Sequence, residues 1–415
     1  LMQCGVEVER LTEEAKLLSY EEALRLVLEN TVPLGSEEVA LGELLGRVLA
    51  MPIAARTDLP PFDNSAVDGF AFHVTDVQEG LRWRQFRVVG ESKAGSKSLP
   101  TLNSGEALRV FTGAPLPPEV GAVAMQEICP VDDGHVKVDD VVDPEDHIRR
   151  RGSEAHFGSV VVPPILVTPP VIAALSAAGH DRALVFKRPQ VGILVTGDEL
   201  AVPGSELLPG QVYESNGAAI RAAVLALGLP EPKLLRCADS AQDTRTALTS
   251  LTESCDVVIT SGGVSVGLHD VVRPTLEALG VQQIFWGVAI KPGKPIYFGK
   301  KGQIAIFGLP GNPVSALVTF ALFVQPFLRR TSGRAVPTQP RQMVLRQSLT
   351  KRLGRAEFVP CRIAADGAHP VVGRASHKAS CLAEADGLAI LGAERESVLE
   401  GEQVDVIELT WGWEA

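Results

Sequence analysis

The sequence lacks any close pair of cysteines. Its six cysteines are scattered along the chain, and no two of them form a CxxC pattern; they stand at positions 4, 129, 237, 255, 361 and 381. We therefore do not expect a zinc ribbon or a dithiol redox site of that kind. A chain of 415 residues also needs no disulfides for stability, so a reducing cytoplasm is the simplest expectation for its location.

Positive charge and long apolar stretches are also scarce. The chain carries 39 Lys and Arg against 50 Asp and Glu, so it lacks the overall basic surface that is typical of nucleic-acid-binding proteins. Two long uncharged segments, residues 157–179 and 302–328, are interrupted by prolines, which break membrane-spanning helices. The first ten residues contain no uninterrupted apolar segment, because they include Glu7, Glu9 and Arg10. We expect neither a membrane span nor a signal peptide.

The composition provides for several folded domains. Apolar residues make up 45% of the chain and charged residues 21%, and the length corresponds to about two to four globular domains. Apolar residues at helical spacing predict a helix that follows Ser19, which forms a capping box with Glu22, and a second helix over residues 37–50. Between residues 56 and 147, short β-rich segments alternate with Gly and Pro turns, which predicts an inserted β domain.

Strands and helices alternate from about residue 187 to residue 330. The segment from Val191 to Val195 is apolar throughout, as in a parallel strand buried on both faces, and the alternation predicts a doubly wound parallel sheet. The alternation stops near residue 331, and residues 329–355 carry eight Lys or Arg and no Asp or Glu. We therefore expect a multidomain α+β and α/β fold. Its expected parts are an N-terminal domain of residues 1–55 and 148–187, an inserted β-rich domain of residues 56–147, an α/β domain of residues 188–330 and a C-terminal β domain of residues 335–412.

Four predicted turns follow strands of this sheet, and ligands of doubly wound sheets bind beyond the carboxyl ends of the strands. The first turn, Thr196 to Leu200, carries two carboxylates that serve either a ligand or the dipole of a following helix. In the second turn Asp239 precedes Ser240, and this pair taken alone is typical of a helix N-cap.

The third turn, Ser261 to Asp270, is rich in glycine and serine. The backbone N–H groups of Gly262 and Gly263 and the hydroxyl of Ser265 can converge there on a phosphate, although an ordinary tight turn has a similar composition. The segment is neither a GxGxxG fingerprint nor a Walker A loop.

The fourth turn and a lysine-rich turn before it add further anion-binding groups. Asn312 is a candidate N-cap and Pro313 a candidate first helical residue, which places an anion site at a helix start. Lys291 and Lys294 lie on a turn fixed by prolines and form a compact positive point, unless they are ordinary solvated lysines. These groups together fit a phosphorylated or nucleotide ligand with Mg²⁺. The carboxylates available to such a cation are Glu199, Asp239 and Asp270.

One more block is a rigid polar turn, Pro60 to Phe70, which is either structural or functional. These blocks, in this order, resemble those of the MoeA family of molybdopterin molybdenumtransferases, which includes the E domain of gephyrin. The resemblance covers residues 15–410. The segments that carry it are Pro61 to Phe70, Phe111 to Ala114, Ile148 to Gly152, Thr196 to Leu200, Ser261 to Gly267, Lys291 to Pro295 and Gly308 to Ser315.

The resemblance implies an enzyme of molybdenum cofactor biosynthesis. Such enzymes accept adenylylated molybdopterin from a MogA-type adenylyltransferase, insert molybdate at the dithiolene and release AMP, with Mg²⁺ assisting. The resemblance also implies an elongated homodimer, with a linking and dimerising N-terminal domain, a MogA-like α/β domain and a small C-terminal β-barrel domain. Matching motif positions imply a catalytic set of Asp68, Thr112, Glu199, Asp239 and Asp270, of which the last three would hold the metal. The implied substrate-binding residues are Ser65, Gly262, Gly263, Ser265, Lys291, Lys294, Asn312 and Ser376, and Arg362 is added as a further candidate.

The chain departs from the family pattern at a few positions. Pro360 stands where the resemblance places an arginine, and Arg362, two residues later on the same strand face, is the candidate replacement. Glu154 and Gly287 are further departures. A tungstate-handling paralogue and a gephyrin-like scaffold stay open as alternatives, whereas the N-terminal blocks argue against a free-standing MogA-like nucleotidyltransferase.

Overall fold

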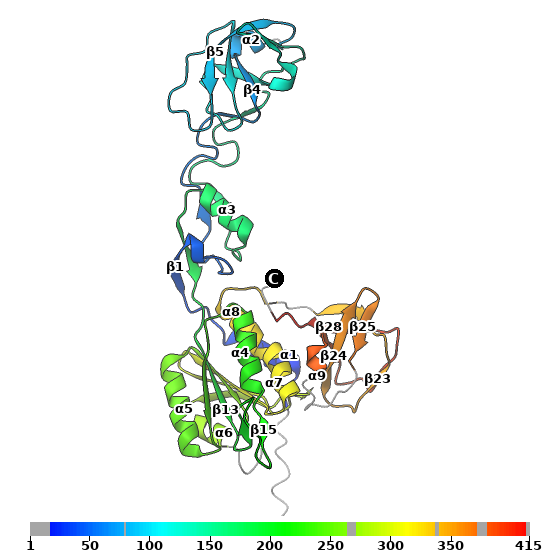
Figure 1. Ribbon diagram of the computed structural model, residues 1–415. Coiled ribbons are helices and arrows are strands. Elements are labelled where there is room, and N and C mark those ends of the chain that lie inside the picture. The colour runs from blue at the N-terminus through cyan, green and yellow to red at the C-terminus, as the bar shows by residue number, and fades with distance from the viewer. Residues whose placement is uncertain (1–16, 79, 264–270, 337–339, 372–379, 412–415) are drawn as a thin grey trace, which may run out of the picture. The chain divides into compact units, whose positions relative to one another are not determined.

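The computed structural model describes residues 17–78, 80–263, 271–336, 340–371 and 380–411. The chain forms two compact units, one of residues 1–36 and 186–415 and the other of residues 37–185 (Figure 1). Among the described helices, none combines the length and the apolarity that crossing a membrane requires.

The unit of residues 37–185 is built around a six-stranded sheet with the strand order β7-β4-β6-β5-β9-β8. Its strands are β4 (Gly69–His73), β5 (Gln85–Ser92), β6 (Glu106–Val110), β7 (Val120–Met125), β8 (Val131–Asp132) and β9 (His135–Lys137), and α2 (Val74–Val77) follows β4. Phe72 and Phe86 are fully buried, and their rings lie 4.8 Å apart. The predicted β-rich segment is therefore a sheet with its own apolar core.

Three two-stranded ladders and one helix complete this unit. The ladders pair β1 (Ser36–Ala40) with β12 (Arg182–Phe186), β2 (Ile53–Ala54) with β11 (Val160–Val162), and β3 (Asn64–Ser65) with β10 (Ile148–Arg149). The helix is α3 (Pro169–Ala177).

The predicted helix over residues 37–50 is wrong. The segment forms β1, a short 3-10 turn over Leu41–Glu43 and irregular chain. Its apolar residues are buried as expected, but β1 pairs with β12, and Gly46 has a φ of +71°, which an α-helix does not allow. Strand pairing across the unit has overridden the helical spacing of these residues.

The other unit contains a six-stranded sheet with the order β16-β13-β17-β21-β20-β18. Its strands are β13 (Val191–Thr196), β16 (Lys233–Cys237), β17 (Val257–Ser261), β18 (Gln282–Trp286), β20 (Tyr297–Lys301) and β21 (Ile304–Leu309). The first four strands in this order are parallel, as predicted, whereas β20 pairs antiparallel with β21 on one side and with β18 on the other. The doubly wound sheet is therefore mixed rather than all parallel.

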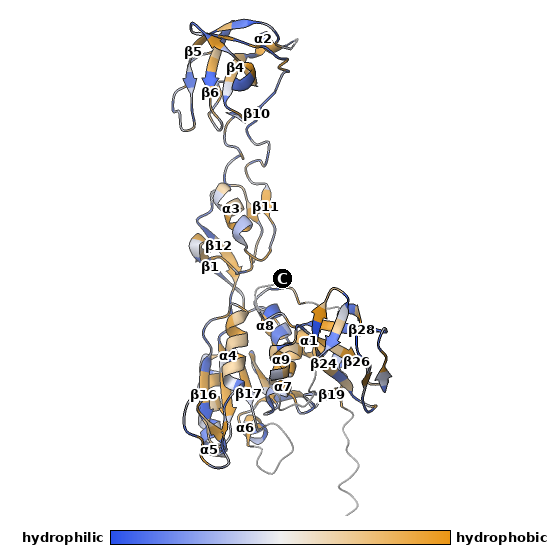
Figure 2. Ribbon diagram, turned by 45° about the vertical axis from the view of Figure 1, so that its right-hand side comes forward, coloured by the Kyte–Doolittle hydropathy of each residue, from blue (hydrophilic) through white to orange (hydrophobic). Residues whose placement is uncertain are grey.

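Helices cover both faces of this sheet, whose central strands are apolar along their length (Figure 2). The helices are α4 (Asn216–Ala226), α5 (Ala241–Ser254), α6 (Val272–Ala278), α7 (Pro313–Thr319) and α8 (Gln325–Thr331), with a π-helical turn over Phe320–Val324 between the last two. Val191, Ile193 and Val195 of β13 pack on the side of α4 and α7, while Leu194 packs on the side of α5 and α6. This two-sided burial explains the uninterrupted apolar run of β13.

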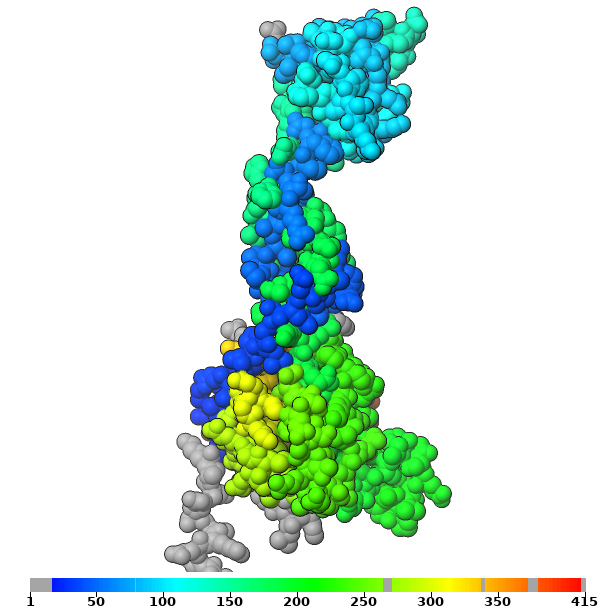
Figure 3. Space-filling model, turned by 90° about the vertical axis from the view of Figure 1, so that its left-hand side faces the viewer, coloured from blue at the N-terminus to red at the C-terminus, as the bar shows by residue number. Residues whose placement is uncertain are grey.

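The helix α1 (Tyr20–Glu29) belongs to this unit. Its predicted capping box is present: the Ser19 hydroxyl accepts the N–H of Glu22, and the Glu22 carboxylate accepts the N–H of Ser19. Tyr20 packs edge-on against Phe323, and Figure 3 shows the segment of α1 in dark blue beside the yellow helices of residues 313–331.

A second sheet of this unit gathers the C-terminal strands with the order β19-β24-β26-β28-β22. Its strands are β19 (Ile290–Lys291), β22 (Arg341–Val344), β24 (Ala356–Ala364), β26 (Gly387–Leu391) and β28 (Gln403–Glu408), and β25 (Gly367–Pro370) pairs with β24. The short elements are α9 (Ser380–Ala383), the ladder of β23 (Leu349–Thr350) with β27 (Ser397–Val398), and the ladder of β14 (Leu200–Ala201) with β15 (Val212–Tyr213). In the sequence β19 lies between β18 and β20 of the mixed sheet, yet it pairs with β24. Ile290 and Lys291 therefore belong to the sheet of the C-terminal strands.

Candidate active site

The four turns singled out in the sequence lie at one edge of the mixed sheet. The parallel register pairs Thr196 with Cys237, Val195 with Ser261, and Ser261 with Leu309. The strands β13, β16, β17 and β21 therefore end side by side, and the turns that follow them share the carboxyl edge. The prediction that these turns form one edge is confirmed.

The glycine-rich turn lies close to the end of β13. Gly262 and Gly263 have φ values of +93° and +64°. A Cβ atom on Gly262 would lie 2.7 Å from the carbonyl oxygen of Thr196, and one on Gly263 would lie 2.6 Å from a methyl group of Val272. Only glycine fits both positions without strain. Both glycines were predicted to bind phosphate through their N–H groups, but the N–H of Gly262 donates to the Leu309 carbonyl at 3.3 Å.

Asn216, at the start of α4, connects this turn to the fourth one. Its side-chain Nδ2 donates to the Ser261 hydroxyl at 2.9 Å and to the Gly311 carbonyl at 2.7 Å. Asn312 caps α7, and Pro313 is the first residue of that helix, as predicted. The sequence indicated Asn216 only as the start of a helix, because its two partners lie 45 and 95 residues away.

Two buried polar atoms at this edge have no hydrogen-bond partner within the described part of the chain. They are Oγ1 of Thr196 and Oδ1 of Asn216, whose residues are 5% and 9% exposed. Buried polar groups are normally satisfied, and exceptions mark places where a ligand, ion or water completes the bonding. The Thr196 hydroxyl lies 3.2 Å from the position of a Cβ on Gly262, which places it at the glycine-rich turn.

The acidic turns after β13 and β16 contact each other. The Asp198 carboxylate accepts the backbone N–H of Asp239 at 3.1 Å. Asp198 and Glu199 are exposed, and Asp239 is half-buried. Asp270, the third expected metal ligand, lies outside the described residues, and among those described no group of three acidic, His or Cys side chains is arranged to hold a metal.

The oxygen donors at this edge nevertheless suit Mg²⁺, which prefers a few carboxylates together with phosphate and water oxygens. The Asp198 carboxylate of the first turn accepts the backbone N–H of Asp239 in the second, and the Thr196 hydroxyl lacks a partner among the described residues.

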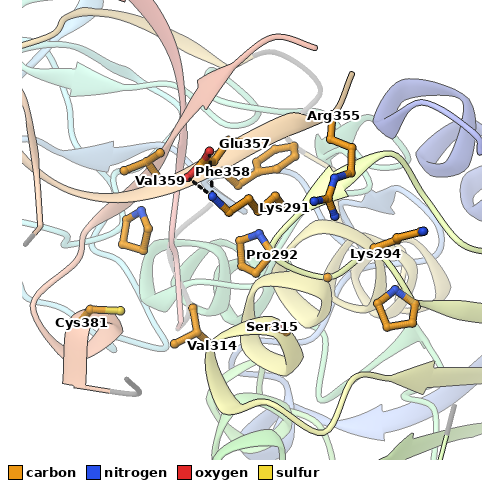
Figure 4. A pocket seen from close by; sticks show the side chains of 13 residues that line it. Lys291, Pro292, Lys294, Val314, Ser315, Arg355, Glu357, Phe358, Val359 and Cys381 are labelled. Atoms are coloured by element: carbon orange, nitrogen blue, oxygen red, sulfur yellow. Dashed lines mark hydrogen bonds and ion pairs between the residues drawn. The ribbon is translucent and has the colours of Figure 1, made fainter. Parts of the chain in front are cut away.

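Lys291 and Lys294 line a pocket of about 440 Å³, which we term the lysine pocket (Figure 4). Its wall is formed by residues 291–295, by Val314 and Ser315 of α7, by Arg355 and residues 357–360 of β24, and by Cys381. Ser315 lies three residues beyond Asn312, so the pocket adjoins the fourth turn of the sheet edge.

An ion pair organises the floor of this pocket. Lys291 on β19 is in register with Glu357 on β24, and its ammonium lies 3.3 Å from the buried carboxylate. This pairing places a carboxylate inside an otherwise cationic pocket and neutralises it there.

The remaining candidates from the last domain lie elsewhere or outside the described residues. Arg362 is exposed, its guanidinium forms an ion pair with Glu384, and it does not line the lysine pocket. Ser376 and the glycine-turn residue Ser265 fall outside the described residues. Arg355, which does line the pocket, was not predicted, although it belongs to the run of basic residues seen in the sequence.

In the other unit, Asp68 and Thr112 contact each other, although 44 residues separate them. The backbone N–H and the hydroxyl of Thr112 both donate to one Asp68 carboxylate oxygen, at 2.7 and 2.8 Å. The backbone N–H contributes most and the hydroxyl next, and together they hold the pKa of the Asp68 carboxyl below its usual range. Asp68 is therefore ionised near neutral pH.

Ser65 has a different environment. It is fully buried, and its hydroxyl donates to the Val67 carbonyl at 2.6 Å. Nearby, Asp63 accepts the guanidinium of Arg150 and the backbone N–H of Arg151. The polar block of residues 60–70 and the arginine-rich segment thus hold each other in place.

Comparisons with known proteins cover nearly the whole chain. Three family descriptions match it in succession: MoeA N-terminal region (domain I and II) over residues 18–179, probable molybdopterin binding domain over residues 192–330, and MoeA C-terminal region (domain IV) over residues 342–409.

Full-length relatives are similar at about one third identity. A molybdopterin molybdenumtransferase from Haemophilus influenzae is 34% identical over 400 residues, which are 94% of this chain and 98% of that protein. Molybdopterin molybdenumtransferase 2 from Mycobacterium tuberculosis is 35% identical over 408 residues, which are 94% of this chain and all of that protein. A crystal structure of a molybdopterin biosynthesis MoeA protein from Pyrococcus horikosii has a TM-score of 0.83 and 32% identity, and covers 96% of this chain and 100% of that one.

Proposed function

This chain belongs to the MoeA family of molybdopterin molybdenumtransferases, enzymes of molybdenum cofactor biosynthesis, and from that premise we propose its specific reaction. The protein inserts molybdate into adenylylated molybdopterin and releases AMP, with Mg²⁺ assisting. Molybdate, the substrate, binds in the lysine pocket. The phosphates and the nucleotide bind along the carboxyl edge of the mixed sheet.

The observation that carries this proposal is the junction of two different anion sites. Among the described residues, the lysine pocket has an excess of cations, whereas the sheet edge has the glycine-rich turn, the start of α7 and carboxylates. Helix α7 joins the two, because Asn312 at its start belongs to the edge and Ser315 lines the pocket. A substrate that carries a metal-binding end and a phosphoanhydride end requires two such neighbouring sites.

The residues at the sheet edge have separate tasks in this proposal. Gly263 presents its backbone N–H group to phosphate, while the N–H of Gly262 donates to the Leu309 carbonyl at 3.3 Å and holds the turn in place. Asn216 holds this turn against that of Asn312. Asp239 and Glu199, together with Asp270 by resemblance, are the residues that would hold Mg²⁺. A Mg²⁺ ion bound to them supplies neutralisation of the negative charge on the phosphoanhydride.

Asp68 contributes to the reaction as a carboxylate. Since the two hydrogen bonds from Thr112 favour its ionised form, Asp68 accepts a proton or orients water rather than donating a proton. The resemblance supplies its assignment to the catalytic set.

The resemblance also supplies the proposed partners. The protein works as a homodimer, and a MogA-type adenylyltransferase delivers its substrate. Light scattering after gel filtration tests the first statement, since a mass of one 44.1 kDa subunit would contradict it.

AMP release from adenylylated molybdopterin tests the proposed reaction. The purified protein is given this substrate and Mg²⁺, with molybdate, with tungstate and with neither oxyanion. Release that depends on molybdate supports the proposal, whereas equal release with neither oxyanion identifies a plain hydrolase and contradicts it. Faster release with tungstate than with molybdate would indicate the tungstate-handling alternative.

Matched lysine variants locate the reaction. Lys294→Ala lowers molybdate-dependent release at least about tenfold, because one cation of the pocket is lost. Lys97→Ala, which removes an exposed lysine from the other unit, leaves the rate unchanged.

A further inference from the structure

The lysine pocket is lined by a third cation, Arg355, which lies outside the turn of Lys291 to Pro295 that indicated the pocket in the sequence. Arg355 immediately precedes β24, and its side chain extends toward the turn of Lys291 and Lys294 (Figure 4). Within the described part of the chain, the Arg355 guanidinium has neither an ion-pair nor a hydrogen-bond partner. A guanidinium that lines a pocket without a carboxylate partner is available to an anionic ligand.

We propose that Arg355 binds molybdate together with Lys294, as the second uncompensated cation of the lysine pocket. This inference rests on the proposed function, since it assigns a residue to the oxyanion in the same pocket.

The charge balance of the pocket is the first argument. Among the described residues, three cations line it, Lys291, Lys294 and Arg355, together with one carboxylate, that of Glu357. Lys291 neutralises Glu357, with which it forms an ion pair at 3.3 Å. The excess of two positive charges therefore comes from Lys294 and Arg355, and it equals the charge of a tetrahedral dianion such as molybdate. Without Arg355 the pocket would leave half of that charge uncompensated.

The neighbouring pocket gives the second argument. A larger cavity of about 850 Å³ shares Lys291, Arg355 and Glu357 with the lysine pocket. Lys351 and Arg352 also line it, and Lys351 is buried with its ammonium bonded to two backbone carbonyls. Arg355 thus stands where two cationic cavities meet, and a dianion that enters through the larger one encounters Arg355 on its way to Lys294.

Arg362 does not take this role, although the sequence made it the candidate. It shares a strand face with Pro360, but Glu384 engages its guanidinium through both the carboxylate and the main-chain carbonyl. Binding molybdate through Arg362 would require breaking this ion pair. The two arginines differ in their partners, so their variants distinguish the two assignments.

Binding of molybdate alone tests the proposal. Isothermal titration calorimetry is performed on the full chain and on Arg355→Ala, Arg355→Lys and Arg362→Ala, with Arg395→Ala as the matched control. Arg395 is an exposed arginine that is ion-paired with Glu402 and lines neither pocket.

Arg355→Ala is expected to raise the Kd for molybdate about 10- to 100-fold, as the loss of one charge-assisted contact entails. Arg355→Lys keeps the charge but loses the planar pair of donors, so its Kd falls between those of the full chain and Arg355→Ala. Arg395→Ala stays within about twofold of the full chain. An Arg355→Ala protein with an unchanged Kd, or a larger effect of Arg362→Ala, would overturn the assignment.

AMP release as a function of molybdate concentration separates this inference from the proposed function. Arg355→Ala raises the half-saturating molybdate concentration more than it lowers the maximal rate. If molybdate binding depends on Arg355 but the rate of AMP release does not change with molybdate concentration, the proposed reaction is contradicted and the assignment of Arg355 stands. If release needs molybdate and Arg355→Ala saturates at the same concentration as the full chain, the assignment fails and the reaction stands. A full-length protein that binds no molybdate would overturn both.

Discussion

Asn216 offers a sharp test of how the sheet edge is held together. Its side chain links β17 to the turn before α7, because it donates to the Ser261 hydroxyl and to the Gly311 carbonyl. Asn216→Ala removes both hydrogen bonds. Ser261 is 1% exposed, so its hydroxyl loses a partner that water cannot easily replace, whereas the exposed Gly311 carbonyl can bind water. We expect a loss of about 1–3 kcal/mol, most of it from the buried side.

Hydrogen exchange measured by mass spectrometry reports this loss locally. Amides of β17 and of the start of α7 should exchange about 5- to 150-fold faster in Asn216→Ala, which corresponds to that range of free energy. Asn30→Ala is the matched control, because Asn30 donates a single side-chain bond, to the Leu26 carbonyl, at a half-buried position. Exchange in Asn216→Ala that equals that of the unmodified protein, or an equal acceleration by Asn30→Ala at the same amides, would refute the reasoning.

Three further predictions concern the acidic and glycine positions. Thr112→Val removes the hydroxyl bond and raises the pKa of the Asp68 carboxyl toward its ordinary value; an NMR pH titration measures this, and an unmoved pKa would refute the assignment of the hydroxyl. The stability that ionised Asp68 contributes is present above its unfolded-state pKa, and it is lost as the pH falls through the lowered folded-state pKa. Asp239→Asn lowers molybdate-dependent AMP release at least about tenfold and raises the half-saturating Mg²⁺ concentration, whereas an unchanged Mg²⁺ dependence speaks against a metal-binding role. Gly262→Ala brings a Cβ to 2.7 Å from the Thr196 carbonyl at a φ of +93° and costs about 1–3 kcal/mol in a thermal unfolding measurement, and an unchanged Tm would mean that the turn can rearrange.

The sequence predicted the part of the fold that depends on local patterns and on strand order. The apolar run of Val191 to Val195 and the strand–turn–helix alternation indicated the doubly wound sheet, and the rule for its carboxyl edge placed four turns together. The capping box of Ser19 and Glu22 fixed the start of α1 in the same way, because its two bonds are formed within four residues.

The failures arose where distant pairing decides the local structure. Residues 37–50 have a helical spacing of apolar side chains, yet β1 pairs with β12 almost 150 residues later. The antiparallel strands β18 and β20 were not foreseen, since they lie between α6 and β21, where no simple alternation continues.

The candidate site shows the same division. Motif spacing identified Lys291, Lys294 and Asn312 as candidates from turns a few residues long; both lysines line one pocket, and Asn312 precedes α7 as its N-cap residue. It could not distinguish Arg355 from Arg362, because the difference lies in Glu384, which removes one guanidinium from availability. Charge in a pocket depends on which ion pairs form across the fold, and a linear sequence does not contain that information directly.

The coordination of molybdenum during AMP release tests the central claim most directly. X-ray absorption at the molybdenum edge, recorded before and after the protein acts on adenylylated molybdopterin, distinguishes oxygen from sulfur ligands. Insertion predicts that sulfur replaces part of the oxygen shell of molybdate, with one molybdenum converted for each AMP released. AMP released while molybdenum keeps an all-oxygen shell would contradict the account.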